Sequence, residues 1–365
     1  MTVEAAAAKI REHAAAGRAV RPRGGGTKLG WSPAGEAAED LDTRGLDRIL
    51  EHNEGDFTAI LEAGAPLVEA QAAFARARQM LALDPPLGEG GAATIGGVIA
   101  TGDSGPLRHR YGGVRDLVVG MTVVLSDGSI AKSGGKVIKN VAGYDLAKLF
   151  AGSFGTLGLI ARVAVRLHPV PSRTATVTAH TGDPDALARA VARLAALPLE
   201  ADCLDAVWDG EMGRLALRFG SSTAAEQARA AAAHVELGDV AIDEDDTEAW
   251  ARIRDLQRAP GGIVLKVSGR PGDLPAVIRA ARAAGGTVVS RGALGLSWLA
   301  LPAGTPVAPI REALAPRACT VLDGAAGVEE PWPAVDPGQL GVMQRIKARF
   351  DPARAFRPGA FVGGI

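Results

Sequence analysis

The chain has 365 residues, 47% of them hydrophobic, and this length predicts two or three domains rather than one compact core. It has 40 lysines and arginines against 41 aspartates and glutamates. The resulting net charge of -1 gives no global field for nucleic acid or an anionic membrane, so we expect no nucleic-acid partner. Neither the two cysteines, Cys203 and Cys319, nor the six histidines have the spacing of metal ligands, and we expect no metal site.

The first 20 residues contain no basic region followed by an apolar run, and charged residues interrupt their alanines. No apolar run approaches the ~20 residues that a membrane-spanning helix requires. We therefore expect a cytoplasmic protein without a transmembrane segment.

The N-terminal elements alternate between helix and strand. The predicted elements are a helix over 2–16 ending at Gly17, a strand over 19–21, a helical turn over 42–52, a strand over 57–63 and a helix over 66–80. This order indicates an α/β unit.

Residues 88–105, GEGGAATIGGVIATGDSG, are rich in glycine. A backbone without Cβ atoms can approach a diphosphate or a flat ligand and direct N–H groups at it. Gly88, Gly90 and Ala93 match the GxGxxA fingerprint of a Rossmann fold, but a proline pair precedes them instead of a strand. The residues that follow, TIGGVIATG, are too β-branched and glycine-rich to begin a helix. We therefore predict an irregular loop that lies along a cofactor.

Two further segments have residues suited to an anion. PRGGGTKLG at 22–30 places three glycines after a short strand, with Arg23 and Lys28 beside them, and an ordinary glycine turn is the alternative. Basic residues at 108–110 and Arg115 surround Tyr111, and there the alternative is a solvated basic face.

The segment VRDLVVGMTVVLSDGSIAKSG at 114–134 predicts a hairpin with its turn at 126–128. The loop GSFGTLG at 152–158 then leads into a strand over 159–167, and HPVPSR at 168–173 marks a domain boundary.

Beyond this boundary the order β, α, β, β, α, β occurs twice, as in tandem ferredoxin-like units. The first set is expected at 174–180, 184–196, 203–208, 214–219, 223–235 and near Val240; the second is expected at 263–268, 274–284, 287–291, 296–301, 307–314 and 319–322. The tail FDPARAFRPGAF at 350–361 is apolar and should pack back on the first domain. The predicted domains are 1–170, 171–325 and a C-terminal tail over 326–365.

Three ordered motifs carry a family resemblance. PRGGGTKLG at 22–30, ATIGGVIATGDSGPLRHRYGGVRDLVVGMTVVLSDG at 93–128 and KNVAGYDLAKLFAGSFGTLGLIARVAVRLHP at 139–169 resemble the FAD-binding domain of the vanillyl-alcohol oxidase family, also called the PCMH-type flavoproteins. The resemblance implies an α+β fold: a PCMH-type FAD-binding domain of two α/β subdomains, followed by a domain of antiparallel sheet with helices.

The resemblance also implies where FAD binds. It places the diphosphate against 22–28, the ribityl chain along 94–97 and 101–105, the flavin near 110–111 and the adenine half near 155–160. The implied cofactor-binding residues are Pro22, Arg23, Gly24, Gly25, Gly26, Thr27, Lys28, Thr94, Ile95, Gly96, Gly97, Thr101, Gly102, Asp103, Ser104, Gly105, Arg110, Tyr111, Gly155, Thr156, Gly158 and Ile160.

Departures from the family pattern refine this expectation. Thr27 stands where members with covalent flavin have a histidine, so FAD is expected to be non-covalent. Arg357 precedes Pro358 and Gly359 where an asparagine is usual, which puts the tail contact with the flavin in doubt. The second domain has no histidine-based metal and base site, and no catalytic residue is identified.

Length and overall pattern are most similar to the FAD-binding subunits of bacterial glycolate oxidase complexes. This resemblance implies oxidation of glycolate, a 2-hydroxy acid, to glyoxylate, with a larger flavin-bearing subunit and an iron–sulfur subunit as partners. It implies a cytoplasmic location, with peripheral association at the inner face of the membrane through the complex. Two alternatives stay open: a free-standing FAD-dependent oxidoreductase of another small hydroxy acid or alcohol, and a structural subunit without cofactor.

Overall fold

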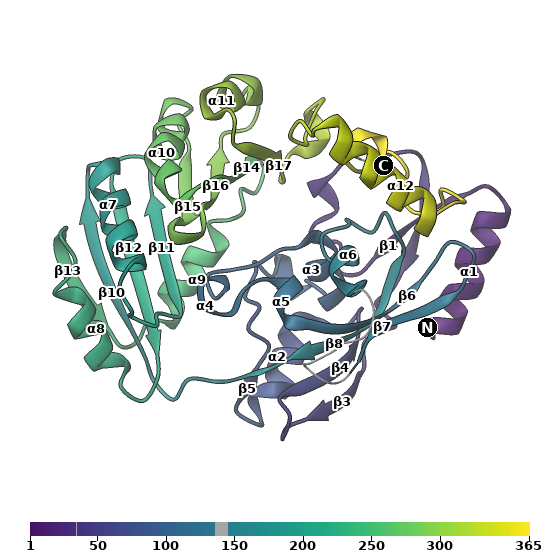
Figure 1. The fold of residues 1–365 in the computed structure, drawn as a ribbon, viewed down its shortest axis with the longest axis horizontal. Coiled ribbons are helices and arrows are strands. Elements are labelled where there is room, and N and C mark those ends of the chain that lie inside the picture. The colour runs from purple at the N-terminus through teal and green to yellow at the C-terminus, as the bar shows by residue number, and fades with distance from the viewer. Residues whose placement is uncertain (34, 136–144) are drawn as a thin grey trace.

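The computed structural model describes residues 1–33, 35–135 and 145–365, and Figure 1 shows two large β-sheets lying side by side. The start of the third motif, residues 139–144, lies outside the described residues.

The first sheet has five antiparallel strands. In sheet order they are β3 (Ile49–Asn53), β4 (Thr58–Glu62), β8 (Leu159–Arg166), β6 (Val118–Val124) and β7 (Ile130–Gly134). The helices α2 (Leu67–Ala75), α3 (Ile95–Thr101), α5 (Val114–Leu117) and α6 (Ala147–Phe150) contribute to its main core. The helix α1 (Val3–Ala15) packs with Val124, Leu159 and Ala161 in a second core. The hairpin predicted from the Ser-Asp-Gly turn is confirmed.

Two small pairings complete this part of the chain. The strand β1 (Ala19–Arg23) pairs in parallel with β2 (Ala38–Asp42), and β5 (Gln79–Met80) pairs with β9 (His168–Pro169). The helical turn predicted over 42–52 is wrong, because β2 ends there and β3 begins. Hydrogen bonding to β1 and β4, and burial of Leu41 and Leu46, decide this conformation against local propensity.

The irregular loop predicted within the long glycine-rich stretch is also wrong in part, because α3 forms there. The hydroxyl of Thr94 caps the helix by accepting from the N–H of Gly97, and Gly102 ends it in the left-handed conformation. The glycines are tolerated because α3 packs closely on its neighbours: a Cβ on Gly96 would lie 2.9 Å from the Ala63 carbonyl oxygen.

The second sheet has eight antiparallel strands, in the order β13-β10-β12-β11-β15-β16-β14-β17. The strands are β10 (Thr174–Thr181), β11 (Cys203–Trp208), β12 (Gly213–Gly220), β13 (Gly238–Asp243), β14 (Ile263–Ser268), β15 (Thr287–Arg291), β16 (Leu296–Leu301) and β17 (Ala318–Val321). In chain order its first four strands and its last four are arranged alike, with the second strand of each set, β11 and β15, paired at the centre. The element predictions for this region are confirmed to within a few residues.

The two faces of the eight-stranded sheet differ. One face forms a core with α7 (Pro184–Ala195), α8 (Ala224–Ala232), α10 (Leu274–Ala283) and α11 (Val307–Leu314). The other face packs with Trp31 and Phe154 of the first part, through residues that include Val264 and Trp298. Because side chains alternate along a strand, the charged residues Asp205, Lys266 and Arg291 share this second face with Val264 and Trp298.

The C-terminal tail returns to the first part of the chain. It contains α12 (Pro337–Phe350), and Figure 1 places this helix on the side of α1 and β1. Phe356 is fully buried and bridges Val20 of β1. The Lys347 ammonium donates to the carbonyl oxygens of Thr156 and Phe356 and to the Asp351 carboxylate, at 2.6–2.8 Å. Lys347 therefore ties the tail to the 152–158 loop.

No helix among the described residues is long and apolar enough to cross a membrane.

Candidate functional site

A cleft lies between the loop after β1, the helix α3 and the loop before β8. We call it the glycine-rich cleft, and its space is about 730 Å³, part of it open to solvent. Its lining comprises residues 22–29, Thr43, Ala63, Thr94, Gly96, Gly97, Ala100, Thr101, Phe154, Gly155, 158–160 and Arg357.

The loop at 24–28 offers the cleft an almost bare backbone. Its five backbone N–H groups donate to no acceptor in the described part of the chain, and all five residues line the cleft. Gly24 and Gly25 are required by close packing, because a Cβ would lie 2.2 Å from the Thr94 hydroxyl oxygen and 1.7 Å from the Ala92 carbonyl oxygen, respectively. Unpaired N–H groups on such a loop form a site for an anion.

Arg357 is a functional candidate that the sequence left in doubt. It is 7% exposed, lines the cleft, and donates to the Phe154 carbonyl oxygen (2.9 Å) and the Ser32 hydroxyl (2.6 Å). Its Nε has no hydrogen-bond partner among the described residues. Burial lowers the pKa of its guanidinium to about 10. Arg357 thus adds a cation to the cleft where the family pattern has a neutral side chain.

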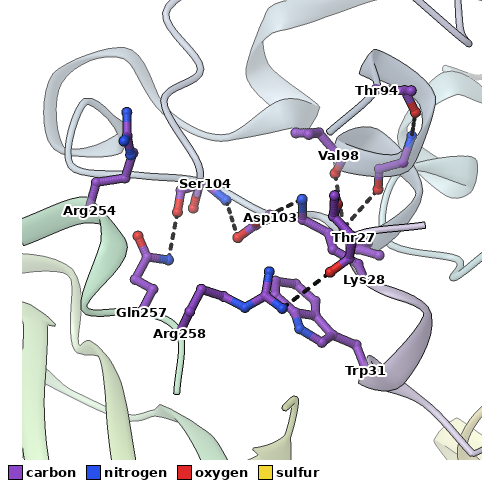
Figure 2. Close-up of polar contacts among 12 residues, drawn as sticks. Thr27, Lys28, Trp31, Thr94, Val98, Asp103, Ser104, Arg254, Gln257 and Arg258 are labelled. Atoms are coloured by element: carbon purple, nitrogen blue, oxygen red, sulfur yellow. Dashed lines mark hydrogen bonds and ion pairs between the residues drawn. The ribbon is translucent and has the colours of Figure 1, made fainter. Parts of the chain in front are cut away.

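Behind the cleft lies a buried ion pair within the first part of the chain, shown in Figure 2. The Lys28 ammonium lies 3.4 Å from the Asp103 carboxylate, and both side chains are almost fully buried. Burial lowers the pKa of Lys28 and raises that of Asp103.

Further contacts join the two parts on either side of this pair. Arg258 donates to the Thr27 carbonyl oxygen (Figure 2). Arg258 also forms a two-fold ion pair with Asp323, which accepts from the Trp31 indole as well. Gln257 donates to the Ser104 carbonyl oxygen. The loop at 24–28 is therefore held from the second part of the chain as well as from β1.

A second cavity adjoins the cleft and shares Thr101 and Phe154 with it. We call it the aromatic pocket, because its walls include Trp31, Phe154, Trp298, Trp332 and Phe361. Asp103 and Lys266 are its charged lining residues, and its space is about 810 Å³, part of it open to solvent. The sequence did not single out Lys266, since nothing local to β14 marks it.

The structure brings many of the implied cofactor residues together and separates others. The residues that line the glycine-rich cleft are Pro22, Arg23, Gly24, Gly25, Gly26, Thr27, Lys28, Thr94, Gly96, Gly97, Thr101, Gly155, Gly158 and Ile160. Ile95, Gly102, Asp103, Ser104, Gly105, Arg110, Tyr111 and Thr156 are not among its lining residues. Of these, Asp103 lines the aromatic pocket.

Arg110 and Tyr111 lie at a different surface hollow with His168. Arg110 forms an ion pair with the buried Asp202 at 3.4 Å, and the Tyr111 and His168 rings are in contact. Burial, with Asp202 nearby, raises the pKa of Tyr111 to about 12. Arg110 therefore contributes to a contact with the second part of the chain.

Comparison with known proteins finds a matching family model for the first part of the chain. Residues 1–134 match the family model described as an FAD binding domain. FAD is the cofactor that this match supports.

Two curated relatives match over partial lengths. Glycolate oxidase subunit GlcE of Escherichia coli is 39% identical over 133 residues, 36% of this chain and 38% of that protein. Glycolate oxidase subunit GlcD of Bacillus subtilis is 36% identical over 188 residues, 50% of this chain and 40% of that protein. The matched segments thus span about two fifths of these relatives' length. The relatives support an FAD-dependent oxidoreductase.

A solved structure of alkyldihydroxyacetonephosphate synthase superposes on 98% of this chain and 74% of its own chain, with a TM-score of 0.70 and 15% identity. This likeness shows a shared fold of mixed α/β type with antiparallel sheets.

The glycine-rich cleft fits FAD chemically. Its free N–H groups and Arg357 suit the negative charge of a diphosphate. At Gly24 and Gly25, where a Cβ would clash with neighbouring atoms, no side chain separates the backbone from the ligand. Among the described residues no cluster of His, Cys, Asp or Glu is arranged to hold a metal ion.

Proposed function

We propose that this chain is the FAD-binding E-type subunit of a complex that oxidises glycolate, a 2-hydroxy acid, to glyoxylate. The observation that carries the proposal is the row of free N–H groups at 24–28, within the segment that matches an FAD binding domain. The names of the two relatives support glycolate as the substrate.

In this proposal the glycine-rich cleft holds FAD without a covalent bond. The N–H groups at 24–28 and the Arg357 guanidinium bind the diphosphate, and Thr27 supplies no nucleophilic ring nitrogen for attachment to the flavin. FAD supplies the two-electron redox chemistry when bound. The protein positions it among the loop after β1, the helix α3 and the loop before β8, and Phe154, which is 9% exposed, excludes water there.

The partners in the proposed complex are a larger flavin-bearing subunit and an iron–sulfur subunit that accepts the electrons. Both matched relatives are named as subunits, which supports an assembly. We place the chain in the cytoplasm, with association at the inner face of the membrane through the complex. We also propose the division into an FAD-binding domain over 1–170, a second domain of two ferredoxin-like units over 171–325 and a tail over 326–365.

Purification from the native host tests this proposal. The chain should be yellow, should release unmodified FAD on denaturation, and should co-purify with a larger flavoprotein and an iron–sulfur protein. A colourless chain that takes up no added FAD contradicts the cofactor assignment, and an FAD-loaded chain without partners contradicts the complex.

A second candidate is a free-standing oxidoreductase, and the charged aromatic pocket next to the cleft favours it. The isolated FAD-loaded chain is mixed with glycolate without oxygen. Rapid bleaching of its own flavin absorbance supports the free-standing enzyme and contradicts the accessory role.

A further inference from the structure

The aromatic pocket contains an ammonium group that no described residue pairs directly. Lys266 lies on β14, on the sheet face that meets the first part of the chain, and its side chain is partly exposed to the pocket. Its Nζ lies 5.7 Å from the centre of the Trp298 ring. Within the described residues it donates no hydrogen bond and forms no ion pair at 4 Å or less.

The charges around the pocket leave an excess of positive charge. Among the described residues Asp103 is the one acidic side chain in the lining, and it is paired with the Lys28 ammonium at 3.4 Å. Burial lowers the pKa of the Lys266 ammonium, with Arg108 and Arg291 adding to this effect and Asp103 opposing it. Desolvated positive charge without a partner is costly, so a bound anion would be stabilised here.

The walls restrict the kind of anion. Phe154, Trp332 and Phe361 form a cluster of rings with centres 4.6–5.5 Å apart. One free ammonium beside such apolar walls suits a singly charged group on a small carbon skeleton better than a phosphate dianion, which needs several donors.

The pocket also has a polar counterpart to the ammonium. The Asp103 carboxylate lines the pocket; its Oδ1 accepts from the Ser104 N–H, and its buried Oδ2 lies 3.4 Å from the Lys28 ammonium. A hydroxyl group next to the carboxylate of a ligand would lie in a pocket that also has this polar side chain in its wall. Neither Lys266 nor Asp103 lines the glycine-rich cleft, although the two cavities share Thr101 and Phe154.

We propose that the aromatic pocket is a binding site for a small monocarboxylate, with the Lys266 ammonium as the anchor of the carboxylate. The inference deepens the proposed function, because it places recognition of an organic acid in this chain and not only in a partner. It assigns Lys266 to ligand binding and makes no claim on the chemical step.

The test measures binding to the full-length chain loaded with FAD. Glycolate, acetate and the neutral amide glycolamide are titrated by calorimetry and by the change in flavin absorbance. Glycolate and acetate should bind, and glycolamide should bind about tenfold more weakly or not at all, because it lacks the charge. Equal binding of glycolate and glycolamide, or no binding of either acid, overturns the proposal.

Two variants localise the site. Lys266→Met should weaken glycolate binding about tenfold or more with FAD affinity unchanged, while the exposed Lys132→Met should bind like the parent chain. Unchanged glycolate affinity in a folded, FAD-loaded Lys266→Met chain overturns the assignment. The ligand comparison on the parent chain decides the question even if this variant fails to fold.

The inference and the proposed function can fail separately. Carboxylate binding that depends on Lys266, in a chain that forms no glycolate-oxidising complex, supports the pocket and contradicts the function. A complex that oxidises glycolate equally well with Lys266→Met, together with unchanged binding, supports the function and overturns the pocket.

Discussion

The glycine-rich cleft and the aromatic pocket adjoin each other but are built in opposite ways. The cleft presents backbone N–H groups and few side chains, whereas the pocket presents large rings and two charged side chains. A backbone site tolerates almost no added atom, but it depends little on the identity of distant residues. A side-chain site can change its ligand through one substitution, because its charge resides in a few side chains.

The largest effect should come from adding one methyl group to the cleft. Gly25→Ala places a Cβ 1.7 Å from the Ala92 carbonyl oxygen, so two loops must separate. We expect a loss of more than about 4 kcal/mol in the free energy of unfolding and no retained FAD. Chemical denaturation and flavin content measure both. Gly30→Ala, with no atom within 4 Å of the new Cβ, should stay close to the parent chain. A stable, yellow Gly25→Ala chain would refute the packing argument.

Lys347→Met should damage the cleft and the pocket together. The change leaves the Asp351 carboxylate and two carbonyl oxygens without their shared donor, and the tail supplies Arg357 to the cleft and Phe361 to the pocket. Loss of one member of a buried ion pair costs about 3–5 kcal/mol, and we expect a loss near the lower end. Thermal unfolding and FAD titration report it. Arg349→Met, at an exposed position of the same helix, serves as the control.

The free energy of unfolding should depend on pH through Asp205, in the eight-stranded sheet. Asp205 is fully buried, with Arg291 at 3.6 Å, and burial raises the pKa of Asp205 to about 6, with Asp84 adding to the rise and Arg291 opposing it. Since the folded state holds this proton more tightly than the unfolded state, its contribution to stability is present below pH ~4 and is lost as the pH rises through about 6.

In the variant Asp205→Asn the side chain at position 205 no longer titrates. Its stability relative to the parent chain should therefore increase by about 3 kcal/mol between pH 4 and pH 8, from the shift of about two pKa units. Urea unfolding at several pH values measures the difference. A constant difference across that range contradicts the prediction, and FAD affinity at pH 8 should be the same in both proteins.

The smallest effect should come from the one cationic side chain that the tail adds to the cleft. Arg357→Gln should weaken FAD binding about tenfold, or about 1.4 kcal/mol, because the diphosphate loses a charged donor. The affinity of the parent chain should also fall more steeply with salt than that of the variant. Arg354→Gln, on the same tail but exposed and paired with Glu36, should leave FAD affinity unchanged. Equal affinities for all three proteins would limit Arg357 to a packing role.

The sequence by itself determined most of the elements beyond residue 174, because alternating apolar residues and clear turns mark each strand and helix. It also marked the three glycines at 24–26 as a candidate site for an anion, and the structure places all three in the lining of the glycine-rich cleft. The motif resemblance identified FAD as the cofactor, which the match over residues 1–134 supports.

Only the tertiary structure decided the rest. The segment 38–53 forms strands because β1 and β4 offer hydrogen bonds that local propensity does not encode. The helix α3 forms because Thr94 caps it and because Gly96 packs closely against Ala63, where a Cβ would clash. The pairing of Lys28 with Asp103, and the exposure of Lys266 to the same pocket, join three distant segments of the chain. Burial lowers the pKa values of Lys28 and Lys266 and raises that of Asp103, because folding removes water from around these groups. The sequence near each residue does not show which distant segments will bury it.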